Sequence, residues 1–448
     1  MADVKIFFEG RKSKGYNNII DSSVFEESIT KAFETIPTGE IKAICFDLKN
    51  VDFIDFLVII NMSAFCQSIR HDNPACIFKF IWPDSQSVFT FLKIWNFKDA
   101  IENAINLDPS KDLENGRKSF LQKESTEEDV YKIVNATFPN TLINNKVKDL
   151  ILYQKFFSVL SFKLDSSVPS STNENSRRVE YSLEDSNSLK ILPNYQVLED
   201  ILHDWREQGI KEVLENVFKD ADGNHLDDYV PNKVIFELIT NALRHPNGTL
   251  LQTSSFFQSK EKNTHITSDH FKIAVWDNGK SMIEVLRDAY IDTKNITTSV
   301  PNEIRFPIFH LNLHEPNKKL NDDRLKVDSR IVPNEGFLSK IGYWNYDYYW
   351  LLSTFFPGVT SDPKGKSITL REDTRAKYRN RGMGLYVLLH TVVNIFNGKI
   401  VVRTGRYNMV IKQNSSKANN YDVDIKRRPE CLPLFSGNLI AVHLPLKY

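Results

Sequence analysis

The chain has 448 residues, which is long enough for two or three domains that each bury a core of their own. Lys plus Arg and Asp plus Glu number 57 each, so the net charge is zero and no overall field favours nucleic acid or an anionic membrane. Aromatic residues make up 12% of the chain, which argues against extensive disorder.

The cysteine pattern and the apolar runs predict a cytoplasmic protein. Cys45, Cys66, Cys76 and Cys431 lack the close spacing of a zinc site. The start MADVKIFFEGRK lacks the apolar core of a signal peptide. The longest apolar runs, such as residues 53–65, are too short and too interrupted to span a bilayer. We therefore expect a reducing compartment, no membrane segment and no nucleic-acid partner.

Strands and helices alternate over the first hundred residues. The strand candidates have alternating apolar residues, and the helix candidates have apolar residues at helical spacing. The predicted strands are KIFF near the start, 41–48 and 76–82, and the predicted helices are 22–38, 57–69 and 88–101. This order predicts a small α/β layer domain.

The order DLKNVDFID, helix, strand and VFTFLKIWNFKDAIE resembles a STAS domain, the fold of bacterial anti-sigma-factor antagonists, over residues 1–110. In the antagonists a phosphorylatable Ser or Thr follows the aspartate at the start of the helix. Here Asp55 is followed by Phe56, Leu57 and Val58, so a phosphorylation switch at this point is not expected. The resemblance then implies a partner-docking or dimerising role, and the alternative is a structural cap without regulatory function.

Residues 111–190 are expected to form a helical and linker region. They contain the charged patch KESTEED, a predicted helix over 147–160 and the polar run DSSVPSSTNENSRRVEYSLEDSNS. The composition of that run is typical of a flexible linker, and the alternative is a recognition loop. Residues 195–217 are predicted to be helical, with an apolar side formed by Leu198, Ile201, Leu202 and Trp205.

Residues 234–245, VIFELITNALRH, predict a helix with two different faces. Glu237, Asn241 and His245 lie at i, i+4 and i+8, so they share one face. Pro231 suits the start of the helix, and Pro246-Asn247-Gly248 suits its end. The polar stripe suits both a metal-bound phosphate with an activated water and an ordinary solvated face. The opposite, apolar arc consists of Phe236, Leu238, Ile239, Ala242 and Leu243.

Two further motifs follow downstream. The predicted strand 271–276 runs into Asp277-Asn278-Gly279, which places a carboxylate at the mouth of a sheet beside a glycine that permits close approach of a flat ligand. NRGMGL (380–385) leads into an apolar helix that ends at Asn397-Gly398 before the strand KIVVRTG. Glycines at a helix start expose backbone N–H groups, which suits phosphate. Taken singly, the first motif is usually a hairpin turn and the second is often a plain helix cap.

In this order the three pieces resemble the GHKL ATPases, the family of DNA gyrase, heat-shock chaperone ATPases, histidine kinases and mismatch-repair ATPases. ELITNALRH resembles the N-box of the family, WDNG its first glycine box and RGMGL its second, and LFSGNLIAVHLPL resembles the closing strand. The resemblance covers residues 191–448. It implies a GHKL (Bergerat-type) α/β sandwich with an enlarged ATP lid, so that the whole chain is α/β (α+β).

The resemblance implies ATP and Mg²⁺ as cofactors and gives each motif a role. Asn241 would contribute an oxygen ligand to Mg²⁺, and Glu237 would be the general base that polarises the attacking water. Asp277 would accept a hydrogen bond from the adenine amino group. His245 would orient Glu237 or Asn241, or simply end the helix. Gly279 would pack on the adenine ring, and Gly382 and Gly384 would surround the phosphates. The implied nucleotide-binding set also includes Met282, Arg381, Met383 and Leu385, with Arg379 beside them.

The chain departs from the family pattern at two places. Lys280 and Ser281 stand where a second glycine is usual, so we expect altered nucleotide affinity or a stiffer loop. About a hundred residues separate the glycine boxes and include the aromatic segment YWNYDYYWLLSTFFPGVTSDP (343–363). Aromatics at this density need burial, either on the sheet of their own domain or in a lid or dimer surface that responds to ATP.

The expected function is therefore an ATP-binding and ATP-hydrolysing signalling switch, in which nucleotide state controls the lid and partner contacts. Partners would be proteins that bind the STAS-like domain or the lid, and a homodimer is a further expectation. The alternatives are a serine/threonine protein kinase of the anti-sigma-factor type and a non-catalytic nucleotide-binding scaffold. A sensor histidine kinase is not expected, because no phosphoacceptor-histidine hairpin precedes the ATPase motifs.

Overall fold

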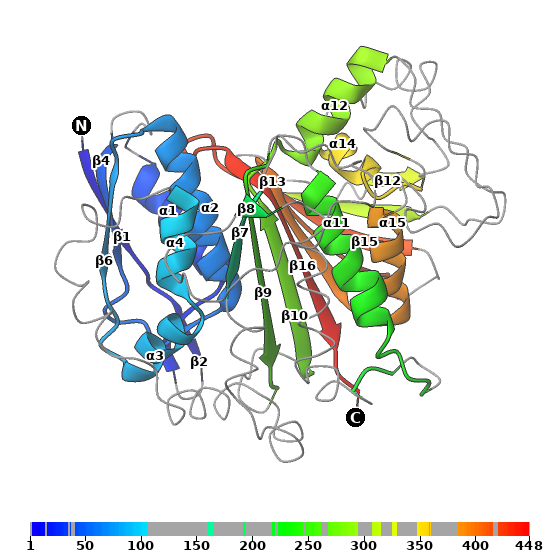
Figure 1. The fold of residues 1–448 in the computed structure, drawn as a ribbon, viewed down its shortest axis with the longest axis horizontal. Helices are drawn as coiled ribbons and strands as arrows, with labels where there is room; N and C mark the ends of the chain where they lie inside the picture. The colour runs from blue at the N-terminus through cyan, green and yellow to red at the C-terminus, as the bar shows by residue number, and fades with distance from the viewer. Residues whose placement is uncertain are drawn as a thin grey trace.

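The computed structural model has a mixed α/β fold with three β-sheets (Figure 1). Two of the sheets lie in an N-terminal unit, residues 2–105, and the third forms the centre of a C-terminal unit, residues 159–447. The structure describes residues 2–13, 16–34, 36, 41–105, 159–164, 191–192, 217–219, 223–244, 248–260, 268–293, 307–314, 325–328, 347–357, 359, 384–414 and 420–447.

The N-terminal unit has a parallel sheet in the order β1-β4-β6, with helices α1, α2 and α4 on one side of it (Figure 1). Asp21 and Asp55 begin α1 and α2, where their carboxylates accept hydrogen bonds from backbone N–H groups of the first turn. The strands are β1 (Ala2–Phe7), β4 (Ile41–Asp47) and β6 (Ile77–Ile81); the helices are α1 (Ser22–Phe33), α2 (Phe56–Asp72), α3 (Gln86–Ile94) and α4 (Phe97–Ile105); a small second sheet contains β2 (Arg11–Ser13), β3 (Tyr16–Ile20) and β5 (Phe53–Ile54).

Two predicted helices of this unit need correction. The helix expected over 88–101 is two helices, α3 and α4, because Asn96 adopts a left-handed conformation with φ of 57°. Asparagine tolerates that conformation better than most residues, and it ends α3. The helix expected over 22–38 ends earlier, at Phe33. The strands 41–48 and 76–82 and the helix 57–69 are confirmed, with small shifts at their ends.

The C-terminal unit is built on a ten-stranded sheet with the order β12-β11-β15-β14-β13-β16-β10-β9-β7-β8. Its centre is antiparallel, since β10 pairs with both β9 and β16, and β16 pairs with β13. The strands are β7 (Leu160–Leu164), β8 (Ile191–Leu192), β9 (Leu250–Gln258), β10 (His270–Asp277), β11 (Ile308–His314), β12 (Leu325–Asp328), β13 (Lys399–Gly405), β14 (Tyr407–Gln413), β15 (Asn420–Arg427) and β16 (Phe435–Pro445).

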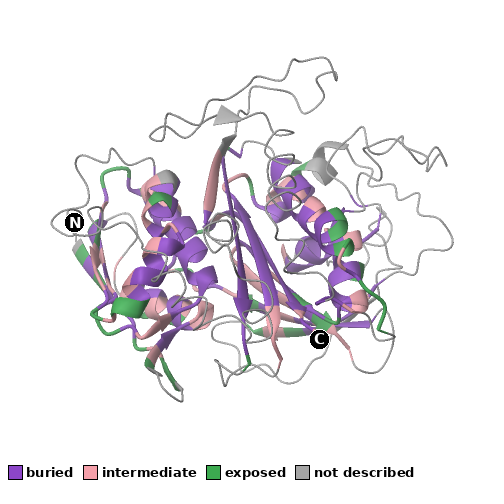
Figure 2. Cartoon of the chain, turned by 60° about the horizontal axis from the view of Figure 1, so that its bottom comes forward, coloured by how far each residue is buried: buried purple, intermediate pink, exposed green. Residues whose placement is uncertain are grey.

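Helices cover both faces of this sheet. One face carries η2 (Val230–Ile235), α11 (Phe236–Arg244), α12 (Met282–Thr293), α14 (Asp347–Ser353), α15 (Gly384–Leu389) and η5 (His390–Ile395), and the other carries the helices of the N-terminal unit (Figure 1). The chain therefore forms four layers: sheet, helices, sheet and helices. Central strands β9 and β10 are buried on both sides, as Figure 2 shows.

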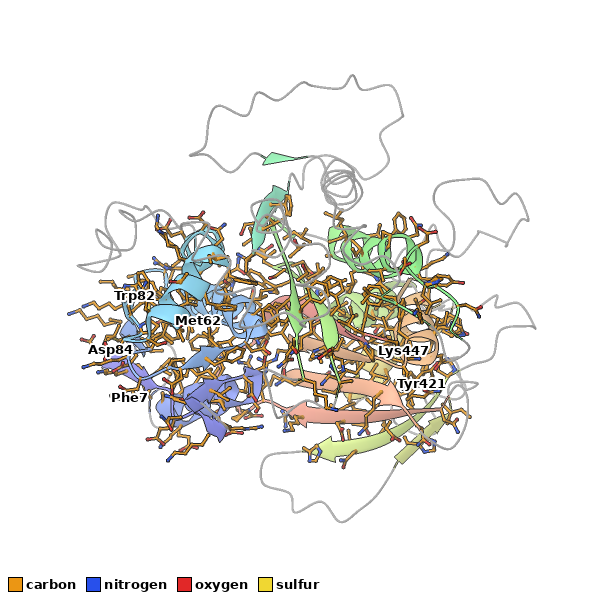
Figure 3. All side chains as sticks on the ribbon, turned by 90° about the horizontal axis from the view of Figure 1, so that it is seen from below. Phe7, Met62, Trp82, Asp84, Tyr421 and Lys447 are labelled. Atoms are coloured by element: carbon orange, nitrogen blue, oxygen red, sulfur yellow. The ribbon has the colours of Figure 1, made fainter. Side chains whose placement is uncertain are left out.

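Side chains of the N-terminal helices fill the space between the β1-β4-β6 sheet and the ten-stranded sheet. Met62 of α2 is completely buried there (Figure 3). Phe256 of β9 lies at the centre of this contact. Its ring stacks on Phe56 at a centroid distance of 5.7 Å and meets Phe91 and Trp95 edge-on. Such aromatic contacts bury large apolar areas, so the N-terminal unit is packed on the sheet as part of one core.

The region between the two units needs a further correction. Leu160, expected at the end of a helix over 147–160, is the first residue of strand β7. Strand β7, which lies within the expected helical and linker region 111–190, belongs to the ten-stranded sheet, and its Phe162 packs against the core. Val217 lies in a turn. Residues 147–158 and 195–216 of the two predicted helices, and the polar run 165–188, lie outside the described residues.

The described part of the aromatic segment 343–363 packs on the sheet of its own unit. Tyr349, Trp350 and Phe355 are buried, and the Phe356 ring stacks on Phe309 of β11 at 5.9 Å. Phe309 in turn contacts Tyr421 of β15. This packing agrees with the expectation that the segment is buried on the sheet of its own domain. Among the described helices, none is long and apolar enough to cross a membrane.

Candidate functional site

Helix α11 carries the first group of candidate residues. It continues directly from the π-helical turn η2, in which Pro231 occupies the first turn, as predicted for a helix start. Leu238 and Ile239 are each 1% exposed and face the core, whereas Glu237 and Asn241 are half-buried. The two-faced helix predicted from the sequence is therefore present, up to its end at Arg244. His245 lies outside the described residues.

Gly384, the first residue of α15, lies directly against this polar stripe. A Cβ atom at Gly384 would be 2.6 Å from Glu237 Oε2 and 3.4 Å from both terminal atoms of the Asn241 amide. A side chain at this position would require the Glu237 carboxylate to move, whereas glycine leaves it in place. The structure thus brings together two motifs that lie far apart in the sequence.

The Asn241 side chain has an unsatisfied polar atom. Its Nδ2 is buried and has no hydrogen-bond partner among the described residues. Buried amide groups are usually hydrogen-bonded, and several other described side chains, among them Asn408 and His443, also contain a buried polar atom of this kind. The two ends of a carboxamide are distinguished only by their hydrogen bonds, so this position suits the oxygen equally well.

Asp277 lies at the end of β10, as the sequence predicted, and its residue is 2% exposed. Its carboxylate accepts hydrogen bonds from Gly279 N at 2.9 Å and from Asn438 Nδ2, which lies 3.2 and 3.3 Å from the two oxygens. Carboxylates that accept several hydrogen bonds are held in one orientation. Asp277 is thus positioned by both its own turn and the neighbouring strand β16.

Asn438 is the residue that sequence reasoning missed. It is 1% exposed, and besides Asp277 it donates to Lys280 O at 2.9 Å. Its Oδ1 accepts from Met282 N at 2.8 Å and from Thr404 Oγ1 at 2.7 Å. One amide therefore joins the ends of β10, β13 and β16 to the start of α12. A possible signal was the polar Asn after Ser-Gly within the apolar closing strand.

Lys280 and Ser281, the departure from the double glycine, form the start of helix α12. Ser281 Oγ donates to Glu284 Oε2 at 2.8 Å and accepts from Glu284 N at 3.2 Å, and Ser281 N also donates to Glu284 Oε2. This is a reciprocal capping box, which satisfies the first N–H groups of a helix. These bonds fix Ser281 at the start of α12, and the expected effects on nucleotide affinity and loop stiffness stay predictions. Lys280 is exposed and pairs with Asp288.

The described candidate residues fall into two groups on one side of the sheet. Glu237, Asn241 and Gly384 form the first group, and Asp277, Gly279 and Met282 form the second. Helix α11 connects them, because it packs on both β10 and α15. Leu385 and Met282 are buried core residues, 9% and 2% exposed. Arg379, Arg381, Gly382 and Met383 lie outside the described residues.

Comparison of the chain with protein-family models, with curated proteins and with solved structures found no match.

Proposed function

We propose that the C-terminal unit binds ATP together with Mg²⁺ and hydrolyses it. The approach of Gly384 to Glu237 and Asn241 carries this proposal. It places a glycine helix start, whose N–H groups suit phosphate, beside a carboxylate and a carboxamide. The helical segment continues from α15 through η5 to Ile395, so its dipole is that of a helix of several turns.

Asn241 is proposed to hold the metal ion through its amide oxygen. Mg²⁺ prefers oxygen ligands and usually takes the rest of them from phosphates and water, so one protein oxygen is enough to locate it. When bound, the ion would neutralise charge on the phosphate oxygens. The buried and unpartnered end of the Asn241 amide supports this assignment.

Glu237 is proposed to act as the general base. A half-buried carboxylate next to the helix start can accept a proton from a water that attacks the terminal phosphate. Gly384 leaves the space that this carboxylate needs, because a methyl group there would displace Oε2. Glycine at this position therefore allows the proposed general base to lie directly beside the start of α15.

Asp277 is proposed to select adenine. A fixed carboxylate accepts a hydrogen bond from an exocyclic amino group, which adenine carries where guanine has a carbonyl oxygen that would be repelled. The bonds from Gly279 N and Asn438 Nδ2 hold the carboxylate in a single orientation for that purpose. A site that orients a polar group in this way discriminates strongly against a ligand that cannot pair with it.

The test measures both hydrolysis and phosphate transfer. The full chain is incubated with γ-labelled ATP and Mg²⁺, and free phosphate is followed for the wild type and for Glu237→Gln. We expect release of phosphate that the substitution abolishes while binding of ATP persists. Asp277→Asn is expected to weaken binding of ATP. Unchanged affinity in this variant would refute the placement of the adenine ring at Asp277.

The same experiment distinguishes the alternatives. Label transferred to protein would support a protein kinase, and binding without turnover would support a scaffold. The N-terminal unit does not favour a kinase that modifies its own chain, since Asp55 pairs with Lys272 and the following Phe56 is completely buried. Glu237 favours hydrolysis over a scaffold.

A further inference from the structure

Three consecutive residues of β16 connect the Asp277 side of the sheet with helix α2 on its other side. Ser436 N donates to Ser68 Oγ at 3.0 Å, and Ser436 Oγ donates to Gln67 Oε1 at 3.2 Å. Two residues further on, Asn438 Nδ2 donates to the Asp277 carboxylate. Asp277, which is proposed to bind adenine, is thus joined to the N-terminal unit through one short backbone segment.

This segment is a β-bulge. Thr404 of β13 pairs with Asn438, but the next residue, Gly405, pairs with Phe435, so Ser436 and Gly437 have no partner in β13. Gly437 has φ of 71°, and a Cβ atom there would overlap the Asp277 carbonyl oxygen. In a regular strand, residues two apart lie on the same face. The bulge breaks this alternation, so Ser436 contacts α2 while Asn438 contacts Asp277.

Strand β10 holds the bulge from the opposite side. Trp276 Nε1 donates to Ser436 O at 2.8 Å, and this tryptophan is completely buried next to Asp277 in the chain. Ser436 is therefore bonded at its N–H, its hydroxyl and its carbonyl. A shift of α2 relative to β10 cannot leave all three bonds intact, because the interior is close-packed.

The N-terminal unit is anchored to the same strands at other points. Lys272 of β10 pairs with Asp55, and Glu26 of α1 pairs with Arg403 of β13 and with Arg428. These contacts fix α1 and the start of α2 on the sheet. At the bulge, α2 contacts Ser436, which lies two residues before Asn438. Asn438 in turn donates to the Asp277 carboxylate.

We propose that Ser68 and Ser436 are positioning residues for the nucleotide site, so that α2 regulates adenine binding through the bulge. This inference rests on the proposed function, since it names the regulation of that same site. Because coupling between two sites is reciprocal, nucleotide bound at Asp277 strengthens the contact between α2 and the bulge by the same factor. The N-terminal unit is then a built-in regulator.

Helix α2 offers a matched pair of variants for the test. Ser63 and Ser68 are both buried, and each hydroxyl donates to the carbonyl four residues earlier, but of the two only Ser68 Oγ accepts from Ser436 N. The dissociation constant of a non-hydrolysable ATP analogue with Mg²⁺ is measured for the full chain. We expect Ser68→Ala to weaken binding about fivefold or more and Ser63→Ala to leave it unchanged.

Hydrogen exchange of the wild type, with and without the ATP analogue, provides a second readout. The ATP analogue is expected to slow exchange of the Ser436 amide and of the last turns of α2. Unchanged affinity in Ser68→Ala, equal weakening in both serine variants, or unchanged exchange at Ser436 would each overturn the regulation while leaving nucleotide binding in place. Absence of nucleotide binding by the wild type would overturn the proposed function and this inference together.

Discussion

Lys272 of β10 and Asp55 at the start of α2 form a buried ion pair, with 3.0 Å between Nζ and Oδ2. The two side chains are only 7% and 11% exposed. Asp55 also caps α2 by accepting from Leu57 N, so one carboxylate both begins the helix and fixes it on the sheet. The start of α2 is buried within the chain, since residues 56–66 are all buried, and the partner-docking role expected for the N-terminal unit stays a prediction.

The first prediction concerns this ion pair. Asp55→Ala should lower the free energy of unfolding by about 3–5 kcal/mol, because Lys272 would be left charged and buried without its partner. Denaturant unfolding measures the change. Asp288→Ala is the control, since it removes the exposed partner of Lys280 and should cost at most about 1 kcal/mol. Equal effects of the two substitutions would contradict the buried role of Asp55.

The second prediction concerns Glu26, which pairs with Arg403 and Arg428. Burial by itself would raise the pKa of Glu26, but the charges of the two guanidinium groups outweigh burial and lower the pKa below its usual 4.5. Its stabilising contribution is therefore complete above pH 4.5 and is lost as the pH falls below that value. Glu26→Gln should cost about 3–5 kcal/mol at pH 7.

The difference between wild type and Glu26→Gln should shrink as denaturant unfolding is repeated at falling pH below 4.5. Glu430→Gln serves as the control, because Glu430 is 75% exposed in its pair with Arg427. A difference that stays constant down to pH 3 would show that Glu26 is not held ionised by the arginines.

The third prediction concerns acid stability at His443. Burial lowers its pKa well below 6.5, and the charges of Lys272, Lys399 and His270 lower it further. The ring is neutral in the folded chain, whereas the unfolded chain binds a proton near pH 6.5. Protonation of His443 therefore does not reduce stability above pH 6.5. Below that pH the free energy of unfolding falls by about 1.4 kcal/mol per pH unit because of this group.

His443→Gln should flatten the pH dependence of unfolding between pH 6.5 and 5. His71→Gln, at a histidine whose side chain is 87% exposed, should leave the dependence unchanged. If the wild type and His443→Gln lose stability in parallel over this range, protonation of His443 does not cause the loss.

The fourth prediction concerns Gly384. Gly384→Ala should lower the rate of ATP hydrolysis at saturating ATP by about tenfold or more, because the new methyl group would displace the Glu237 carboxylate. Binding of ATP should change less, since Glu237 Oε2 is the closest of the affected atoms. Turnover and affinity are measured separately. If Gly384→Ala hydrolyses ATP at the wild-type rate, Gly384 does not lie next to the reacting groups.

The sequence by itself determined most of the local structure around the site. It predicted strands at β10 and β13, and a polar stripe opposite an apolar arc predicted α11. It also placed Asp277 at a strand end and Gly384 at a helix start. These features depend on side chains within a few residues of one another, so a local pattern contains them. Where one residue changed the backbone, as Asn96 does between α3 and α4, the pattern was misleading.

The tertiary structure alone decided which groups meet. Asp55 and Lys272 are 217 residues apart, and nothing near either residue indicates the other. The approach of Gly384 to Glu237, and the contacts of Asn438 with Asp277, likewise join separate segments. Such contacts arise because each sheet face and helix stripe must bury its apolar surface against another element, and the best fit among all elements is a property of the whole chain.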